Sequence, residues 1–277
     1  MDPIAIRIGP LAVHWYGILV VTGALAGAYV SSSEAKRRGW DPDHIWNALF
    51  VTLVFGIIGA RLYHVLTPSP SSGLSVSYFL QHPEHIIATW QGGLGIYGGF
   101  AGGVLGFFVY ARLNHLDFWR WADVAIVGLP LGQAIGRWGN FINQELYGKP
   151  TTLPWGIYID PAHRYAGYES YSHFHPTFLY ESIWNIGVCV FLIFISRRWG
   201  EKLLKGEVLC VYLVLYPLGR ILMELVRLDS LTAGGVPVAT WVSIALLAGS
   251  AAVIVLRRFV IKEQPSPWDS ELKPANV

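Results

Sequence analysis

The 277-residue sequence is poor in charge and in cysteine. Only 14% of its residues are charged, whereas soluble domains contain about 25%, and its mean hydropathy is +0.42. A net charge of +2 without a basic, aromatic-rich cluster argues against a nucleic-acid partner. The two cysteines, Cys189 and Cys210, lie within apolar runs. This excludes a disulfide framework, and we expect both thiols to pack against apolar neighbours.

Several functional signatures are also missing. The sequence has no HExxH, paired-aspartate or GxSxG motif, which argues against the intramembrane metallo-, aspartyl and serine proteases. It has no internal repeat of the kind found in many transporters. The string GLGIYG at 93–98 matches GxGxxG, but no strand precedes it. The first residues lack the basic region of a signal peptide, so we expect no cleavage.

What the sequence does contain is long apolar runs of near membrane-spanning length. Seven stretches qualify, at about 12–33, 44–66, 94–113, 121–142, 177–196, 207–226 and 236–256. They predict an all-α integral membrane protein with about seven transmembrane helices, forming a single domain over residues 1–261. The longest connections are at about 67–93 and 143–176, and the tail 262–277 is expected to be disordered.

Basic residues predict the orientation of these spans. Thirteen lysines and arginines follow the first, third, fifth and seventh stretches, whereas the opposite side carries Arg7, Lys149 and Arg164. By the positive-inside rule, the thirteen face the cytoplasm. The N-terminus is then outside, the C-terminus is cytoplasmic, and the two long loops are on the outer side.

Polar side chains gather near the predicted outer ends of the spans. The set comprises His14, Tyr16, Arg61, Tyr97, Arg137, Glu145, Glu181, Arg220, Glu224 and Arg227. An arginine at the middle of a membrane helix costs about 2.5–3.5 kcal/mol, so several at one level need a reason. Such arginines form either structural ion pairs or an anion site for a lipid phosphate, which the guanidinium fork fits. Arg227 alone could also extend to the interface.

The ion-pair interpretation has candidate partners. Glu224 lies four residues after Arg220, on the same helix face, and Glu145 lies eight after Arg137. Glu181 could equally be a buried partner of another span. His14, Tyr16 and Tyr97 could equally belong to an interfacial aromatic belt.

Two glycine stripes flank Tyr97 in the third apolar stretch. They consist of Gly95, Gly99 and Gly103, and of Gly98, Gly102 and Gly106. Small residues at this spacing allow helices to approach closely. We expect close packing on two sides, which would fix the position of Tyr97.

Five segments resemble, in chain order, the motifs of the bacterial prolipoprotein diacylglyceryl transferases. They are HWYG (14–17), GARLYHVL (59–66), GRWGNFINQELYG (136–148), HPTFLYE (175–181) and GRILMELVR (219–227). The resemblance implies transfer of a diacylglyceryl group from phosphatidylglycerol to the lipobox cysteine of a preprolipoprotein signal peptide. It further implies release of glycerol 1-phosphate at the outer, periplasmic face of the bacterial cytoplasmic (inner) membrane, with no cofactor and no metal.

The resemblance also assigns residues. Arg137 would contact the lipid phosphate, Asn140, Glu145 and Gly148 would belong to the same site, and Tyr16 would lie at the substrate. Arg220 and Glu224 match an essential arginine and its acidic neighbour. We therefore predict phosphatidylglycerol-binding residues Arg137, Asn140, Tyr16, His14, Arg61, Gly148 and Glu181, and catalytic residues Tyr97, Arg220, Glu224 and Glu145.

Tyr97 departs from the family pattern, because many members have histidine there, in HGG where this chain has YGG. A neutral tyrosine has a pKa near 10, which makes it a poor base for a thiol of pKa about 8.5. Either neighbouring arginines activate the tyrosine hydroxyl, or no strong base is needed because a fraction of the thiol is already ionised. We favour the second, with Tyr97 orienting substrate.

Two other classes of protein would also use membrane arginines. A transporter or anion channel could use them as a filter, but it needs polar groups through the midplane, and here only Asp123 lies toward the cytoplasm. A non-catalytic lipid-binding scaffold would explain the arginines but not the acids and the tyrosine near them.

Overall fold

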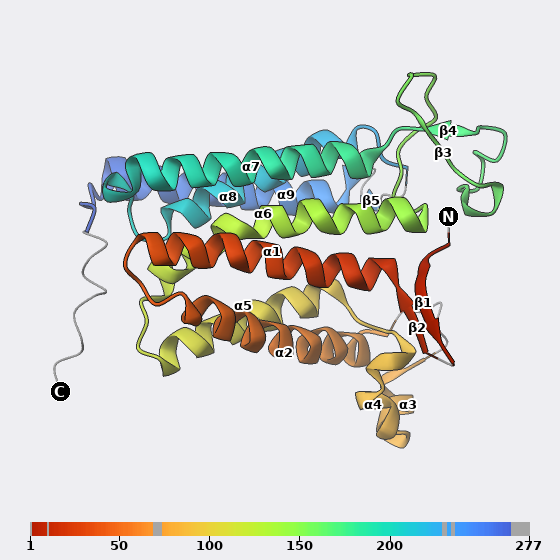
Figure 1. The fold of residues 1–277 in the computed structure, drawn as a ribbon, viewed down its shortest axis with the longest axis horizontal. Coiled ribbons are helices and arrows are strands. Elements are labelled where there is room, and N and C mark those ends of the chain that lie inside the picture. Colours follow the sequence, from red (N-terminus) through yellow and green to blue (C-terminus); the bar gives the residue numbers. More distant parts are fainter. Residues whose placement is uncertain (1, 10, 69–73, 229–231, 234–235, 267–277) are drawn as a thin grey trace. The chain divides into compact units, whose positions relative to one another are not determined.

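Long helices dominate the structure, a computed structural model that describes residues 2–9, 11–68, 74–228, 232–233 and 236–266 (Figure 1). Within these residues, a helix of 18 or more residues coincides with each of the seven predicted stretches, with ends that differ by up to a few residues. They are α1 (Trp15–Arg37), α2 (Asp43–Leu66), α5 (Ile96–Leu113), α6 (Phe118–Asn143), α7 (Thr177–Trp199), α8 (Glu207–Glu224) and α9 (Val238–Val255).

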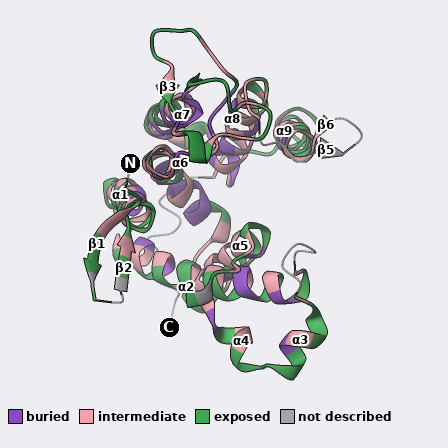
Figure 2. Ribbon diagram, turned by 90° about the vertical axis from the view of Figure 1, so that its right-hand side faces the viewer, coloured by how far each residue is buried: buried purple, intermediate pink, exposed green. Residues whose placement is uncertain are grey.

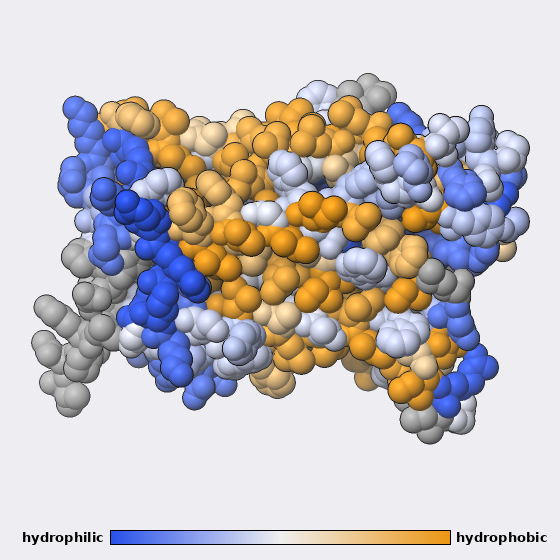
Figure 3. Space-filling view, turned by 45° about the horizontal axis from the view of Figure 1, so that its top comes forward, coloured by the Kyte–Doolittle hydropathy of each residue, from blue (hydrophilic) through white to orange (hydrophobic). Residues whose placement is uncertain are grey.

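Five of these helices, α1, α2, α5, α7 and α9, are long and apolar enough to cross a membrane. The other two carry polar or helix-bending residues: α6 contains Pro130 and Arg137, and α8 contains Pro217 and Arg220. Large apolar side chains cover the long sides of the helices, and hydrophilic residues gather at helix ends (Figure 3). Phe50, Phe100 and Ile183 are each more than half exposed. The prediction of a helical membrane protein is confirmed at this level.

Short elements occupy the segments between and before the long helices, including the first residues of the predicted stretches 12–33 and 236–256. In the part of the chain that the structure describes, three two-stranded antiparallel sheets pair β1 (Ile4–Ile8) with β2 (Leu11–His14), β3 (Ile157–Tyr158) with β4 (His173–Phe174), and β5 (Thr232–Ala233) with β6 (Val236–Pro237). Two short helices, α3 (Val76–Gln81) and α4 (Glu84–Ile87), lie in the 67–93 connection. The predicted start of the first span was wrong by three residues, because residues 12–14 pair in the N-terminal hairpin. Most of the predicted tail, from 267 on, lies outside the described residues.

The chain forms two compact units. The first contains the residues up to Glu34 and those from Ala122 onward, and therefore most of α1 and α6 together with α7, α8 and α9. The second, Ala35–Trp121, contains α2 to α5.

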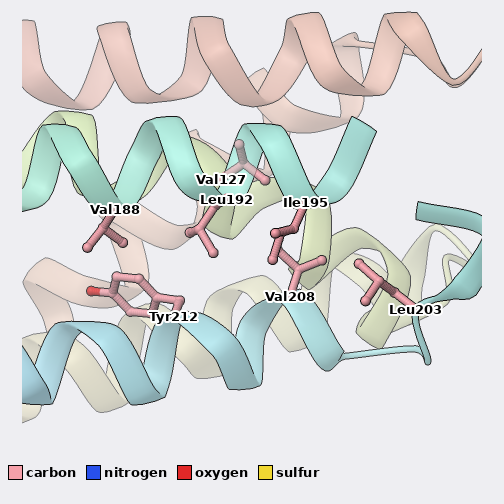
Figure 4. Packing of buried hydrophobic residues seen from close by; sticks show 7 residues of the cluster. All are labelled: Val127, Val188, Leu192, Ile195, Leu203, Val208 and Tyr212. Atoms are coloured by element: carbon pink, nitrogen blue, oxygen red, sulfur yellow. The ribbon is translucent and has the colours of Figure 1, made fainter. Parts of the chain in front are cut away.

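In the first unit, α7 buries one face and leaves the other exposed (Figure 2). Side chains from α6, α7, α8 and the connection between α7 and α8 meet in one apolar cluster (Figure 4), which comprises Val127, Val188, Leu192, Ile195, Leu203, Val208 and Tyr212. Helices α1 and α6 approach so closely that a Cβ on Gly128 would lie 1.9 Å from the Gly27 carbonyl oxygen. Such contacts hold membrane helices together by van der Waals packing.

Asp123 is structural rather than part of a polar lining. It is fully buried on α6, and its carboxylate accepts hydrogen bonds from the backbone N–H groups of Gly206 (2.7 Å) and Leu209 (2.9 Å). A carboxylate at a helix N-terminus satisfies orphan donors and complements the helix dipole. Asp123 therefore fixes the start of α8.

In the second unit, glycines bring α2 and α5 together. A Cβ on Gly98 would lie 2.2 Å from the Gly59 carbonyl oxygen, and one on Gly102 would lie 2.3 Å from the Phe55 carbonyl oxygen. The predicted packing on two sides was wrong within this unit, because Gly99 and Gly103 also face α2, where a Cβ on either would lie 3.4–3.5 Å from an α2 side chain. Both stripes therefore serve one broad helix contact.

Candidate functional site

A buried carboxylate, Glu181, forms ion pairs with three arginines in the first unit. It forms ion pairs with Arg137 and, through Oε1, with Nη1 of Arg220 at 3.7 Å and Nη1 of Arg227 at 3.6 Å. Glu181 stands near the start of α7, where its side chain is 8% exposed. The arginines come from the last third of α6, the end of α8 and the segment just after α8. Because these helix ends meet, residues 90 positions apart in sequence share one site, which we call the arginine cluster (Arg137, Glu181, Arg220, Glu224 and Arg227).

The arginine cluster carries an excess of positive charge. Glu224 adds a second carboxylate, whose Oε2 lies 3.0 Å from Nη2 of Arg220. Three guanidinium groups against two carboxylates leave one positive charge. Arg137 and Arg220 remain 20% and 18% exposed, so an anion can approach them. The cluster can therefore hold its arginines in place and still bind a phosphate.

Amide side chains extend the arginine cluster along GRWGNFINQELYG. Nη1 of Arg137 donates to Oδ1 of Asn140 at 3.3 Å, and Nδ2 of Asn140 donates to Oε1 of Glu145 at 2.9 Å. Asn143 donates to the same carboxylate oxygen at 3.2 Å. These hydrogen bonds fix which way the Asn140 amide points.

The predicted partner of Arg137 was therefore wrong, because its ion pair is with Glu181 and Glu145 is linked to it only through Asn140. The physical reason is that α6 ends at Asn143, and positive φ angles at Gln144 (52°) and Leu146 (56°) turn the chain. Glu145 then cannot continue the helix face. The predicted pairing of Arg220 with Glu224 is confirmed.

Gly148 is needed for a close backbone approach. Its N–H donates to the His175 carbonyl at 2.9 Å, and it forms an isolated antiparallel bridge with Arg227. A Cβ here would lie 2.8 Å from the Val226 carbonyl oxygen and 2.9 Å from Cβ of His175. Gly148 thus positions the backbone of Arg227.

Of the two predicted N-terminal residues, one lies beside the segment that holds the arginine cluster. Tyr16, on the first turn of α1, packs its ring on Gly139 of α6, where a Cβ would lie 2.5 Å from Cδ2 of the tyrosine. His14 ends strand β2 opposite Ile4 and has an exposed side chain. Among the described residues, the hydrogen bonds and ion pairs of the structure do not connect His14 with the arginine cluster.

The loop after α6 is fastened by two side chains. Gln144 and Asp160 exchange hydrogen bonds, and the amide of Gln144 lowers the pKa of the Asp160 carboxyl below its ordinary value. Tyr147 is 2% exposed, donates to the His163 carbonyl at 2.7 Å, and has its pKa raised by burial. The loop 143–176 therefore has a fixed core beside the arginine cluster.

Two predicted residues, Arg61 and Tyr97, belong to the second unit. Tyr97 is the second residue of α5, is 62% exposed, and has its ring centre 5.9 Å from that of Tyr63. Arg61 of α2 is 7% exposed and donates to four backbone carbonyls between His85 and Gly93.

Apolar surface adjoins the arginine cluster in the first unit. A groove of about 530 Å³ runs along α7 and α8, and Trp184 lines both this groove and a small hollow beside Arg220. Other residues lining the groove are Tyr180, Ile183, Gly187, Phe191 and Leu215. A cationic site beside an apolar groove suits an anion that carries hydrocarbon chains.

Sequence reasoning underrated Arg227 and missed Asn143. Arg227 was open to the interpretation of an extended interfacial arginine, yet its side chain is 6% exposed and pairs with Glu181. Its distance of seven residues from Arg220, about two helical turns, was the available signal. Asn143 lies within GRWGNFINQELYG, but nothing in its spacing predicts its hydrogen bond to Glu145.

The fold and the arginine cluster together define a helical membrane protein with a cationic site where α6, α7 and α8 meet. The profile of the family "Prolipoprotein diacylglyceryl transferase" matches residues 3–256. The chain belongs to this family, and the resemblance in the sequence motifs is confirmed.

Individual relatives agree over nearly the full length of the chain. It is 43% identical to a phosphatidylglycerol–prolipoprotein diacylglyceryl transferase of Trichormus variabilis, with 97% of this chain and 95% of the relative covered. Proteins of the same name from Synechocystis and Streptococcus uberis are 41% and 39% identical. Coverage of this chain is 96% and 93%, and that of the relatives is 92% and 96%.

Proposed function

We propose that this protein transfers the diacylglyceryl group of phosphatidylglycerol to the lipobox cysteine of preprolipoproteins, the first step of lipoprotein maturation. Membership of the transferase family supports the activity. The observation that carries the proposal to this chain's own residues is the arginine cluster, with three guanidinium groups around Glu181 and one excess positive charge. That charge suits the phosphodiester of the lipid, and the apolar groove suits its acyl chains.

The reaction is a substitution at the glyceryl carbon attached to the phosphate. The thiolate form of the cysteine, whose proton has already been lost to water, forms a C–S bond while the C–O bond to phosphate breaks, and the bonding electron pair leaves with the phosphate oxygen. The products are a thioether and glycerol 1-phosphate. Arg137 contacts the phosphate and, with Arg220, stabilises the charge that builds on it as it departs.

The remaining polar residues hold or complete this site. Glu181 and Glu224 orient the arginines, Glu145 orients Asn140 toward the headgroup, and Gly148 positions Arg227. Tyr16 lines the substrate site beside α6, and His14 contributes from the end of β2. Tyr97 orients the substrate by its hydroxyl, because a few per cent of a cysteine thiol is already thiolate near neutral pH.

The proposed setting is the bacterial cytoplasmic membrane. All seven long helices cross it, the N-terminus and the arginine cluster are on the outer, periplasmic side, and the C-terminus is cytoplasmic. The support is the thirteen-to-three asymmetry of basic residues. Arg137 and Arg220 in α6 and α8 explain why these two helices are less apolar than the other five.

The test is direct detection of the product. Purified protein in detergent is incubated with phosphatidylglycerol and a lipobox peptide, and mass spectrometry looks for the diacylglyceryl adduct. We expect adduct from the wild type and none from folded Arg137→Ala. Arg198→Ala, which removes an exposed arginine at the far end of α7, is the matched control and should retain activity. A folded wild type that forms no adduct with any of several peptides would contradict the proposal.

A further inference from the structure

The Arg61 side chain donates its hydrogen bonds to backbone carbonyls of one loop, residues 85–93. Its Nε donates to the Ile86 carbonyl at 2.9 Å, and its Nη1 donates to the carbonyls of Gly92 (2.6 Å) and Gly93 (3.0 Å). Nη2 donates to the His85 carbonyl. A guanidinium has five N–H donors, so these four acceptors occupy most of them. The side chain is also buried, at 7% exposed.

The same loop leads directly into the helix that carries Tyr97. Gly92 and Gly93 have φ angles of +84° and +71°, in the left-handed region that favours glycine. A Cβ on Gly93 would lie 2.4 Å from Nε2 of His64 and 2.9 Å from Nη1 of Arg61. Two residues later, the N–H of Gly95 donates to the Ala60 carbonyl at 2.9 Å, and α5 begins.

Arg61 contrasts with the arginines of the arginine cluster. Arg137 and Arg220 face carboxylates and stay about one fifth exposed, whereas Arg61 faces neutral carbonyls and is enclosed. To bind a phosphate, Arg61 would have to give up hydrogen bonds that hold 85–93 against α2.

We propose that Arg61 is a positioning residue that holds the 85–93 loop, and with it the start of α5, where Tyr97 meets the substrate. It does not bind the lipid phosphate. This inference rests on the proposed function, because it assigns Arg61 a part in that reaction. It replaces the sequence-based expectation that Arg61 is a phosphatidylglycerol ligand.

The test compares Arg61→Lys with Arg61→Gln in the adduct assay, with kcat and KM for phosphatidylglycerol measured separately. A positioning role predicts that kcat falls about three- to tenfold in both variants, and no further than in Tyr97→Phe, because Arg61 acts through Tyr97 and small misplacements near the chemistry slow it. KM should change less than about threefold. Lysine should not rescue, because one ammonium cannot reach four carbonyls that a planar fork reaches. Arg112→Gln, at the other end of α5, is the matched control.

Three outcomes would overturn the inference. A raised KM that lysine largely restores would make Arg61 a phosphate ligand. A lower melting temperature with an unchanged kcat for the folded fraction would make its role one of stability alone. A kcat that stays at the wild-type value in both variants would remove the positioning role.

A second variant addresses the loop from its other side. Gly93→Ala leaves Arg61 intact but pushes the loop off its contacts with His64 and Arg61. It should lower kcat like Arg61→Gln, and the double variant should lose little more than either single variant, because both act on one loop. Multiplicative losses would contradict this. If Arg61→Gln does not fold, the kcat of Gly93→Ala still tests whether the loop positions the site. Adduct formation by the wild type is measured first. A wild type that forms no adduct contradicts the transferase proposal, whereas an active wild type with unaffected Arg61 variants contradicts only the inference about Arg61.

Discussion

Glu181→Gln should expose how much the arginine cluster depends on one carboxylate. The substitution keeps the shape of the side chain and removes its charge, so the cluster changes from one excess positive charge to two. Glu224, which pairs with Arg220, is then the remaining carboxylate of the arginine cluster for three guanidinium groups. Removing one partner of a buried ion pair costs about 3–5 kcal/mol, because the remaining charge stays buried without compensation. Glu181 is 8% exposed and pairs with three arginines, so we expect a loss in that range.

The assay is thermal unfolding of the purified protein in detergent. For chains of about 150–250 residues, 1 kcal/mol corresponds to about 2–4 °C. The expected decrease is therefore on the order of 10 °C. Glu201→Gln, which neutralises an exposed carboxylate near the far end of α7, should change Tm by no more than about 1–2 °C.

A charge-balanced double variant tests the reasoning itself. Glu181→Gln combined with Arg227→Gln returns the arginine cluster to one excess positive charge. If repulsion among the arginines causes the loss, the double variant should be more stable than the sum of the two single effects predicts. Single effects that add within about 0.5 kcal/mol would refute this mechanism. So would a Glu181→Gln protein that melts within about 2 °C of the wild type.

Two further predictions concern Tyr97 and the loop 143–176. Tyr97→Phe should slow adduct formation by less than about tenfold, whereas loss of a general base costs about 10²–10⁴; a folded but inactive variant would make the hydroxyl the base. Asp160 has a lowered pKa in the folded protein, so its stabilising contribution is present above the ordinary aspartate pKa and is lost as pH falls through the folded value. The Tm advantage of wild type over Asp160→Asn should therefore be constant from pH 7 to about pH 5, shrink as the pH falls below the ordinary aspartate pKa of about 4, and be lost below the lowered pKa of the folded protein; an advantage that does not shrink below about pH 4 would contradict this.

The sequence predicted the helices well because membrane spans leave a strong signal. A run of about twenty apolar residues matches the thickness of a bilayer and is too long for an ordinary buried strand, and a long helix coincides with each predicted stretch to within a few residues. The N-terminal hairpin was missed for the same reason. Residues 11–14, LAVH, are apolar and continuous with the first span, so hydropathy alone cannot tell a strand from a helix start.

Pairings within one helix could be predicted, and pairings between helices could not. Arg220 and Glu224 are four residues apart, which places them on one face. Arg137 and Glu181 are 44 residues apart, and their contact depends on how α6 and α7 pack. No local spacing encodes that packing. Arg61 shows the same limit, because its acceptors are backbone carbonyls, which have no signature in the sequence.

The contrast between Arg61 and Arg137 shows why a buried membrane arginine alone does not identify a ligand site. Both lie near helix ends in motifs of the same family, and both looked like phosphate ligands in the sequence. What separates them is the partner. Neutral backbone carbonyls accept the hydrogen bonds of Arg61, and its side chain is buried. Arg137 instead forms an ion pair with Glu181, and its side chain stays partly exposed. An arginine that shares one carboxylate with two others keeps unbalanced positive charge for an incoming anion. Under the proposed function, we therefore expect the number of arginines per carboxylate, rather than burial, to mark the phosphate site.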